Sequence, residues 1–198
     1  MAILAGDALL TLAFEVLSRL KHIHAESKIR LVEELSRAAG TVGGPGWAGG
    51  PGWAGGMIGG QVNDIEGERQ QPTALLLESI HKAKTGALLR ASVRMGGIYA
   101  DATANELAAL SEYGEHIGLA FQIIDDVLDV EESSEALGKT AGKDQAQQKI
   151  TFPAVYGLER SREMAEGERQ AAHAALRTLD DRAERLRQIA NFVVQRKA

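Results

Sequence analysis

Three carboxylates in the segment Phe121–Asp129, FQIIDDVLD, are the side chains of this sequence best placed to do chemistry. If the segment is helical, as its apolar spacing indicates, Asp125 and Asp129 lie one turn apart on one face, with Gln122 a turn before them and Asp126 beside them. Such carboxylates repel one another unless a cation or hydrogen-bond donors neutralise them. Their oxygens suit Mg²⁺, which usually binds through one or two carboxylates plus a substrate phosphate. The alternative is a solvated acidic face.

A polar loop, residues 138–153, follows the acids and carries Lys139, Lys143 and Lys149. Its GKT triplet is not a P-loop, because Ser133 stands where that motif needs glycine and a helix precedes it instead of a strand. The acidic segment is not an EF-hand calcium loop either, because its acids do not alternate around a central glycine. Carboxylates for a metal and lysines for phosphate oxygens together predict a site for a diphosphate and its metal.

Helices must position these groups, because Ala, Leu, Glu, Arg and Gln dominate and β-branched alternation is scarce. We therefore expect an all-α domain. Its first helix, Ala2–Leu20, is so apolar that we expect it to be buried on most sides. The other expected helices are Ser27–Ala39, one starting at Met57, Thr73–Tyr99, Asn105–Glu131, and helices over Phe152–Ala198 broken near Gly167 and Leu179.

The composition excludes several classes of protein. With 198 residues, 44% of them hydrophobic, the chain can bury a core as a single domain. A net charge of −5 without a basic tract argues against nucleic acid as a partner. The absence of cysteine rules out disulfides and fits a reducing compartment. Because we find neither a leader nor a membrane span, we expect a cytoplasmic protein.

A repeat interrupts the helical pattern between residues 40 and 56. The hexapeptide GPGWAG at 44–49 recurs unchanged at 50–55. Proline and glycine at this density cannot continue a helix, so the segment should form a loop inserted in the domain. We interpret it as a duplication in a tolerant connection; a tryptophan-bearing binding loop is the alternative.

Two further polar groups lie on the helices around the acids. Gln61 and Asp64 are three residues apart and share a face. Lys84-Thr85-Gly86 interrupts an apolar stretch, where a threonine hydroxyl beside a glycine can relax the helix and turn polar atoms inward.

Taken in order, these segments resemble the trans-isoprenyl diphosphate synthases, the family of farnesyl and geranylgeranyl diphosphate synthases. FQIIDDVLD resembles the family's second aspartate-rich motif. The family's other landmarks are similar to LAGDALL at 4–10, GGQVND at 59–64, KTGALL at 84–89, and GKTAGKD with KITFP across 138–153. The resemblance covers nearly the whole chain, and it implies an isoprenoid-synthase helical bundle.

The resemblance implies that Mg²⁺ helps an allylic diphosphate to ionise and that isopentenyl diphosphate attacks the resulting cation. The metal residues that it implies are Asp125, Asp126 and Asp129. The allylic diphosphate would be held by Lys84, Lys139 and Lys149. Thr85 and Gln122 would place oxygen dipoles near the cation, and Gln61 with Asp64 would support the site. Lys84, Thr85, Gln122 and Asp125 would thus act in catalysis.

The sequence departs from this family in one important respect. The first aspartate-rich motif precedes LAGDALL in the family, and the 198 residues do not contain it. Met1 resembles an internal methionine, so we expect a chain that lacks N-terminal helices and turns over poorly. A non-catalytic subunit paired with a full-length synthase is an alternative, and a class I terpene cyclase is a further one. The family is commonly homodimeric.

Overall fold

Helices form almost all of the described chain. The computed structural model describes residues 1–41, 56–67, 73–137 and 151–197, without the side chains of 79 and 133–137, and has no strand within these ranges. The elements are α1 Ala2–Ser18, α2 Ala25–Ala39, α3 Gly56–Gly67, α4 Ala74–His81, the π-helical turn η1 Lys82–Gly86, α5 Ala87–Tyr99, α6 Ala104–Leu137, α7 Phe152–Tyr156, α8 Leu158–Ala175, the 3₁₀ segment η2 Leu176–Ala183 and α9 Glu184–Gln195. The all-α prediction is therefore confirmed.

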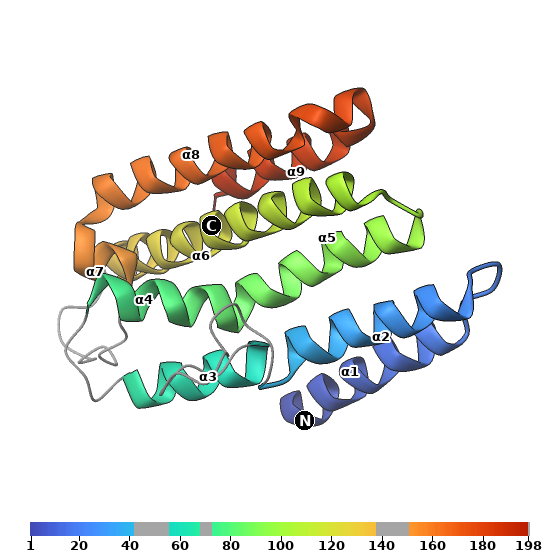
Figure 1. The fold of residues 1–198 in the computed structure, drawn as a ribbon. Coiled ribbons are helices and arrows are strands. Elements are labelled where there is room, and N and C mark those ends of the chain that lie inside the picture. The colour runs from blue at the N-terminus through green and yellow to red at the C-terminus, as the bar shows by residue number, and fades with distance from the viewer. Residues whose placement is uncertain (42–55, 68–72, 138–150, 198) are drawn as a thin grey trace.

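The long helix α6 is the centre of the bundle. It packs most extensively against α8 on one side and α5 on the other. In Figure 1, α8 and α9 cover one side of α6, α4 and α5 lie on the opposite side, and α2, α3 and then α1 follow outward. The helix that carries the acidic motif thus has neighbours along most of its length.

A capping box fixes the start of α6. Thr103 Oγ1 accepts a hydrogen bond from the backbone N–H of Glu106 at 3.3 Å, and Thr103 N–H donates to Glu106 Oε2 at 2.8 Å. The two residues satisfy backbone donors that a helix N-terminus leaves without partners. This local sequence signal sets the register in which the acids follow about six turns later.

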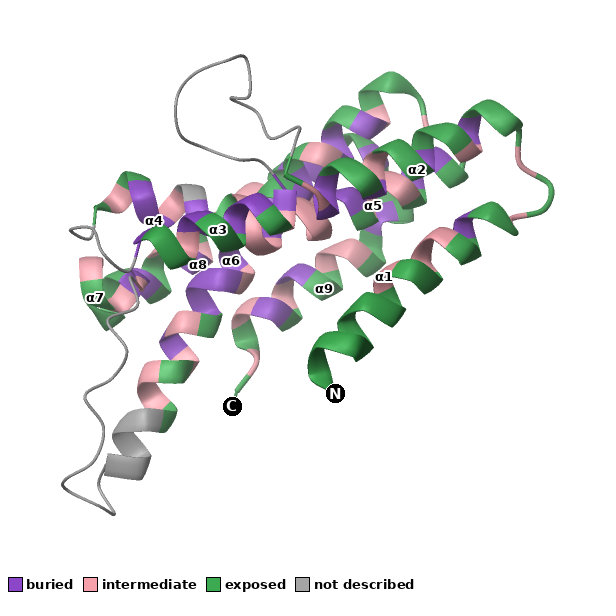
Figure 2. Cartoon of the chain, turned by 90° about the horizontal axis from the view of Figure 1, so that it is seen from below, coloured by how far each residue is buried: buried purple, intermediate pink, exposed green. Residues whose placement is uncertain are grey.

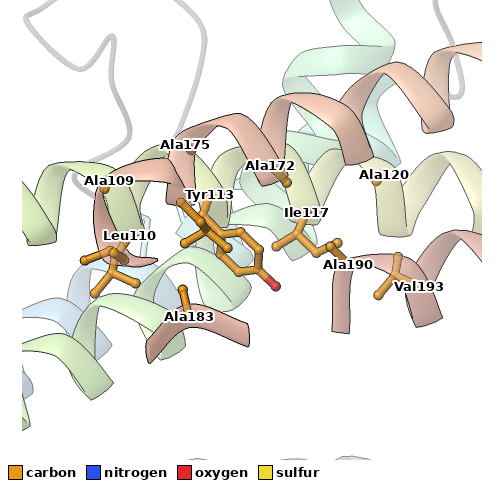
Figure 3. Packing of buried hydrophobic residues seen from close by; sticks show 12 residues of the cluster. Ala109, Leu110, Tyr113, Ile117, Ala120, Ala172, Ala175, Ala183, Ala190 and Val193 are labelled. Atoms are coloured by element: carbon orange, nitrogen blue, oxygen red, sulfur yellow. The ribbon is translucent and has the colours of Figure 1, made fainter. Parts of the chain in front are cut away.

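The core between α6, α8 and α9 surrounds Tyr113, whose exposure is 1%. Figure 3 shows its ring among small and branched side chains, including Ile117, Ala172 and Ala190. The hydroxyl donates to the Leu186 carbonyl at 2.8 Å, and burial raises the pKa of Tyr113 to about 12. The phenol is therefore a neutral structural group that ties α6 to α9.

The turn η1 confirms the expected relaxation of the helix at Lys84-Thr85-Gly86. Instead of one continuous helix over 73–99, α4 and α5 are joined by a single π-helical turn at Lys82–Gly86. Neighbouring backbones approach it closely. A Cβ on Gly118 of α6 would lie 2.8 Å from Gly86 Cα, and one on Gly60 of α3 would lie 2.2 Å from the backbone N of Lys84. Glycine thus permits both contacts.

The prediction that the first helix is buried on most sides is wrong. In α1 only Leu17 is buried, while Ile3, Leu4 and Leu9 are 81%, 64% and 66% exposed. Figure 2 shows α1 exposed along most of its length. It packs against α2 along one side only, so its other apolar side chains face outward. Within the described ranges, none of the helices has the length and apolar character that crossing a membrane requires.

The predicted break near Gly167 is also wrong. Helix α8 continues through Gly167, because a single glycine with helical dihedrals only lowers helix stability. The chain turns instead at Gly157, with φ +82°, and at Asp180, with φ 46°. The second of these turns follows Leu179 directly and confirms the break predicted there.

The predicted repeat loop falls mainly on residues 42–55, outside the described residues. Its flanking residues are described and lie together. Gly59 N–H donates to the Gly40 carbonyl at 3.4 Å, and a Cβ on Gly56 would lie 2.4 Å from the same oxygen. The end of α2 therefore meets the start of α3 directly.

Candidate diphosphate and metal site

The acidic motif divides between the surface and the interior of the bundle. Asp125 and Asp129 are exposed, whereas Asp126 has a side chain only 13% exposed. Consecutive residues on a helix point about 100° apart, while residues four apart nearly align. Asp125 and Asp129 therefore share a face, and Asp126 turns toward α4 and α7.

Donors from two other segments surround Asp126. Its Oδ2 accepts a hydrogen bond from the backbone N–H of Phe152 at 2.9 Å, and the same oxygen lies 3.3 Å from Nε2 of His81. Phe152 stands at the start of α7, where Thr151 Oγ1 accepts from Ala154 N–H as the helix cap. Phe152 thus meets the acidic motif through its backbone donor.

The expectation that three aspartates converge as one cluster therefore needs correction. Within the ranges that the structure describes, no group of three or more acidic, histidine or cysteine side chains gathers as a metal site. Asp126 is engaged away from the exposed pair. Two carboxylates on one helix face still suit Mg²⁺, which binds few protein carboxylates and completes its shell with water and phosphate. Asp125 and Asp129 consequently fit the ion.

Asp125 has a cationic neighbour at the end of α9. Arg196 Nη2 donates to Asp125 Oδ1 at 2.9 Å and to the Phe121 carbonyl at 3.2 Å. Its guanidinium lies 4.0 Å from the centroid of the Phe121 ring. The sequence interpretation missed this arginine, because 71 residues separate it from its aspartate.

A cleft of about 430 Å³ lies beside η1. Its lining residues are Met57, Gln61, Lys84, Thr85, Leu88, Leu89 and Ser92. Lys84 Nζ donates to Asp64 Oδ2 at 2.6 Å, and Gln61 Nε2 donates to the same oxygen at 3.4 Å. The structure thus brings Gln61, Asp64, Lys84 and Thr85 close to one another, and their role in binding stays a prediction.

Gln122 has different surroundings from those expected. Its side chain is 8% exposed, and its Oε1 lies 2.8 Å from Nδ1 of His81. It is not among the residues that line the cleft. The sequence interpretation also passed over His81, although a histidine three residues before Lys84 and at the apolar helix face was a usable signal.

Lys139 and Lys149, predicted to hold the diphosphate, lie outside the described residues. Among the described lysines, Lys84 is therefore the one that combines a cleft position with an acidic partner. A lysine whose side chain is 34% exposed can exchange its carboxylate partner for phosphate oxygens. The arrangement offers one cation for a diphosphate, an apolar wall, and two carboxylates for a metal.

The fold and this site define an all-helical protein with a lysine-bearing cleft and paired carboxylates on its central helix. The polyprenyl synthetase family model matches residues 1–193, and the chain belongs to that family.

Named relatives agree with this assignment. The chain is 42% identical to geranylgeranyl pyrophosphate synthase 11, chloroplastic, of Arabidopsis thaliana, over 99% of this chain and 53% of that protein. It is 39% identical to farnesyl diphosphate synthase of Geobacillus stearothermophilus, over 99% of this chain and 62% of that protein. The chain thus spans about half to three-fifths of the length of these curated relatives.

Solved structures share the fold. An FPP/GFPP synthase from Zymomonas mobilis is similar with a TM-score of 0.76 and 32% identity, over 97% of this chain and 60% of that one. A geranyltransferase from Helicobacter pylori, complexed with magnesium and isoprenyl diphosphate, is similar with a TM-score of 0.70 and 29% identity. The match covers 98% of this chain and 59% of that one. The neighbours therefore confirm the isoprenoid-synthase type of bundle.

Proposed function

We propose that this chain binds an allylic diphosphate with Mg²⁺ and belongs to a prenyltransferase that condenses it with isopentenyl diphosphate. The cleft lined by Gln61, Lys84 and Thr85, with Asp64 bonded to Lys84, carries the proposal. The turn η1 that bears Lys84 packs on the acidic helix α6. The family match and the magnesium and isoprenyl diphosphate named for the Helicobacter pylori neighbour support it.

The residues of the cleft have distinct roles in this proposal. Lys84 exchanges Asp64 for diphosphate oxygens, and Thr85 presents its hydroxyl beside them. Leu88 and Leu89 supply an apolar wall for the prenyl chain. Asp125 and Asp129 would hold Mg²⁺, which would supply positive charge to neutralise the leaving diphosphate.

The reaction breaks the allylic carbon–oxygen bond, and the electron pair leaves with the diphosphate. The double bond of isopentenyl diphosphate then forms the new carbon–carbon bond, and a proton is lost. Because the 198 residues contain a single DDxxD motif, we expect very slow turnover. Losing even one preorganised stabilising donor commonly lowers the rate by about 10²–10³.

A non-catalytic subunit is the second candidate, favoured by the exposed apolar side chains of α1. Ile3, Leu4 and Leu9 offer a surface on which a second copy or a full-length synthase would pack. Co-purification with a longer member of the family would favour this role. Cytoplasmic location stays a prediction, and some plant relatives are named as chloroplastic.

Calorimetry with inorganic pyrophosphate tests the binding proposal. We expect pyrophosphate binding that requires Mg²⁺. Its affinity should fall at least about tenfold in Lys84→Ala, because a charge-assisted contact is lost. Lys82→Ala is the matched control: Lys82 belongs to the same turn, but it is exposed and paired with Glu78 at 3.2 Å. Uptake without Mg²⁺, or equal uptake by both variants, contradicts the proposal.

An assay with labelled isopentenyl diphosphate and an allylic diphosphate tests the expected slow turnover. We expect transfer by the purified chain to be close to background. Ready turnover that Asp125→Ala abolishes would refute the predicted impairment while supporting the chemistry.

A further inference from the structure

His81 is a buried polar side chain that the proposed chemistry does not use. It ends α4 with 7% exposure, and its ring stacks on Phe152 with centroids 5.4 Å apart and planes at 29°. Nδ1 lies 2.8 Å from Gln122 Oε1, and Nε2 lies 3.3 Å from Asp126 Oδ2. The imidazole of His81, at the end of α4, therefore contacts both α6 and α7.

The two ring nitrogens face different residues of α6. Nε2 is buried and, among the described residues, lacks an aligned hydrogen-bond partner although it is within ion-pair distance of Asp126. Burying a polar atom costs free energy unless a partner compensates for it. We therefore expect the buried Nε2 to have a role in orienting a neighbouring side chain.

Asp126 depends on few donors for its orientation. Phe152 N–H donates to the same oxygen that His81 faces, and the carboxylate is nearly buried. If the imidazole is removed, Asp126 keeps one described donor and can rotate toward solvent. There it would approach Asp125 and Asp129 and add a third negative charge to their face.

We propose that His81 is a positioning residue that holds the Asp126 side chain toward α7. Asp125 and Asp129 then remain the two carboxylates on the exposed face of α6. The inference rests on the proposed function, because its consequence is the geometry of the metal–diphosphate site. A carboxylate released toward Asp125 and Asp129 would add negative charge beside a bound cation and so raise the affinity of that face for the cation.

Three substitutions separate the two nitrogens. His81→Gln places an amide near the Nε2 position and retains a contact to Asp126. His81→Asn places an amide near the Nδ1 position and retains a contact to Gln122. His81→Phe keeps the ring stacked on Phe152 and removes both nitrogens.

The first measurement is the protection of the Phe152 amide by NMR hydrogen exchange, which reports the bond to Asp126. The second is Mn²⁺ affinity by electron paramagnetic resonance in the presence of inorganic pyrophosphate. We expect His81→Gln to keep the protection and bind Mn²⁺ within about threefold of the wild type. His81→Asn and His81→Phe should lose the protection and bind Mn²⁺ about three- to tenfold more tightly, because a third carboxylate would join Asp125 and Asp129.

The control is His116→Phe, which removes a half-buried histidine of α6 paired with Glu168 at 2.7 Å on α8. It should lower thermal stability without changing Mn²⁺ affinity. If His81→Phe does not fold, the Gln and Asn variants still decide the question, because only the nitrogen position differs between them.

The outcomes separate this inference from the proposed function. If the wild type binds Mn²⁺ with pyrophosphate and all His81 variants bind equally, the positioning role is wrong and the proposed function stands. If the wild type does not bind, the proposed function is wrong, and the Phe152 amide alone decides the positioning role. Unchanged protection in His81→Asn overturns that role in either case.

Discussion

Asp125 and Asp126 are neighbours in the chain but have opposite environments. Asp126 is held inward by Phe152 N–H, while Asp125 has a half-exposed side chain that faces Arg196. A helix separates consecutive side chains by about 100°, so Asp125 shares a face with Asp129 while Asp126 is directed to the covered side of α6. The roles of single residues in this motif therefore depend on which face of α6 is covered.

Arg196 would compete with the proposed Mg²⁺ for Asp125. Its guanidinium donates to Oδ1 at 2.9 Å, an oxygen that a metal also needs. We predict that Arg196→Gln binds Mn²⁺ alone about three- to tenfold more tightly, because a ligand oxygen is freed and a repelling charge is removed. Electron paramagnetic resonance without pyrophosphate measures this affinity. Arg185→Gln is the control, since Arg185 is exposed and bonds to Gln188 on its own helix.

At the scale of elements, close backbone contact positions Lys84. Helix α3 approaches η1 at Gly60, and α6 approaches it at Gly118. Side chains larger than hydrogen would separate these helices, so the position of the cleft depends on glycines that carry no functional group.

We predict that Gly60→Ala displaces η1 and disrupts the cleft. Its Cβ would lie 2.2 Å from Lys84 N and 2.6 Å from Lys84 Cα, both backbone atoms that cannot rotate away. The free energy of unfolding should fall by about 1–3 kcal/mol, and pyrophosphate binding should weaken with it. Thermal unfolding and calorimetry measure the two effects.

Gly167→Ala is the matched control for that substitution. A Cβ at Gly167 meets nothing within 4 Å, and the residue lies inside α8. Alanine should therefore raise the free energy of unfolding by about 0.5–1 kcal/mol, because it restricts the unfolded chain. Equal effects of the two substitutions would contradict the proposed close contact between α3 and η1.

At the scale of the whole molecule, one ion pair joins three helices. Arg94 of α5 donates to both carboxylate oxygens of Glu34 on α2, at 2.9 and 2.5 Å, and to Ser111 Oγ on α6 at 2.5 Å. The hydrogen bond from Arg94 is the largest cause that holds the pKa of Glu34 below its ordinary value of 4.5. The pair thus connects the outer helices to α6 and makes stability depend on pH.

Glu34→Gln should lower the free energy of unfolding by about 1–3 kcal/mol at pH 7. Because the pKa of Glu34 is lower when folded, its stabilisation is fully present above about pH 4.5 and is lost as the pH falls through the folded value. The difference between wild type and variant should therefore shrink below pH 4.5 in urea titrations. Glu33→Gln, which breaks an exposed pair with Arg37, should change stability by less than about 1 kcal/mol.

The apolar surface of α1 predicts self-association. We expect Leu9→Glu to shift the chain toward monomer in light scattering after size exclusion, because a charge would enter the apolar contact. Phe192→Glu on α9 is the control, since its side chain is 70% exposed on a different helix. A monomeric wild type contradicts this prediction.

Several features could be predicted from the sequence because they are local. Helical periodicity indicated the all-α fold, and the KTG triplet indicated the relaxed turn. Spacing alone placed Gln61 and Asp64 on one face, and the motif order indicated the family. The sequence also identified the residue types that suit a diphosphate.

Tertiary packing decided the rest, because it brings together groups that are distant in the sequence. Whether an acid faces solvent or a backbone N–H depends on which helices cover α6, and no spacing rule contains that information. The pairing of Asp125 with Arg196, the contact of His81 with Asp126, and the exposure of α1 all arise in this way. The sequence by itself determined the kinds of groups in the site, and the fold determined their directions.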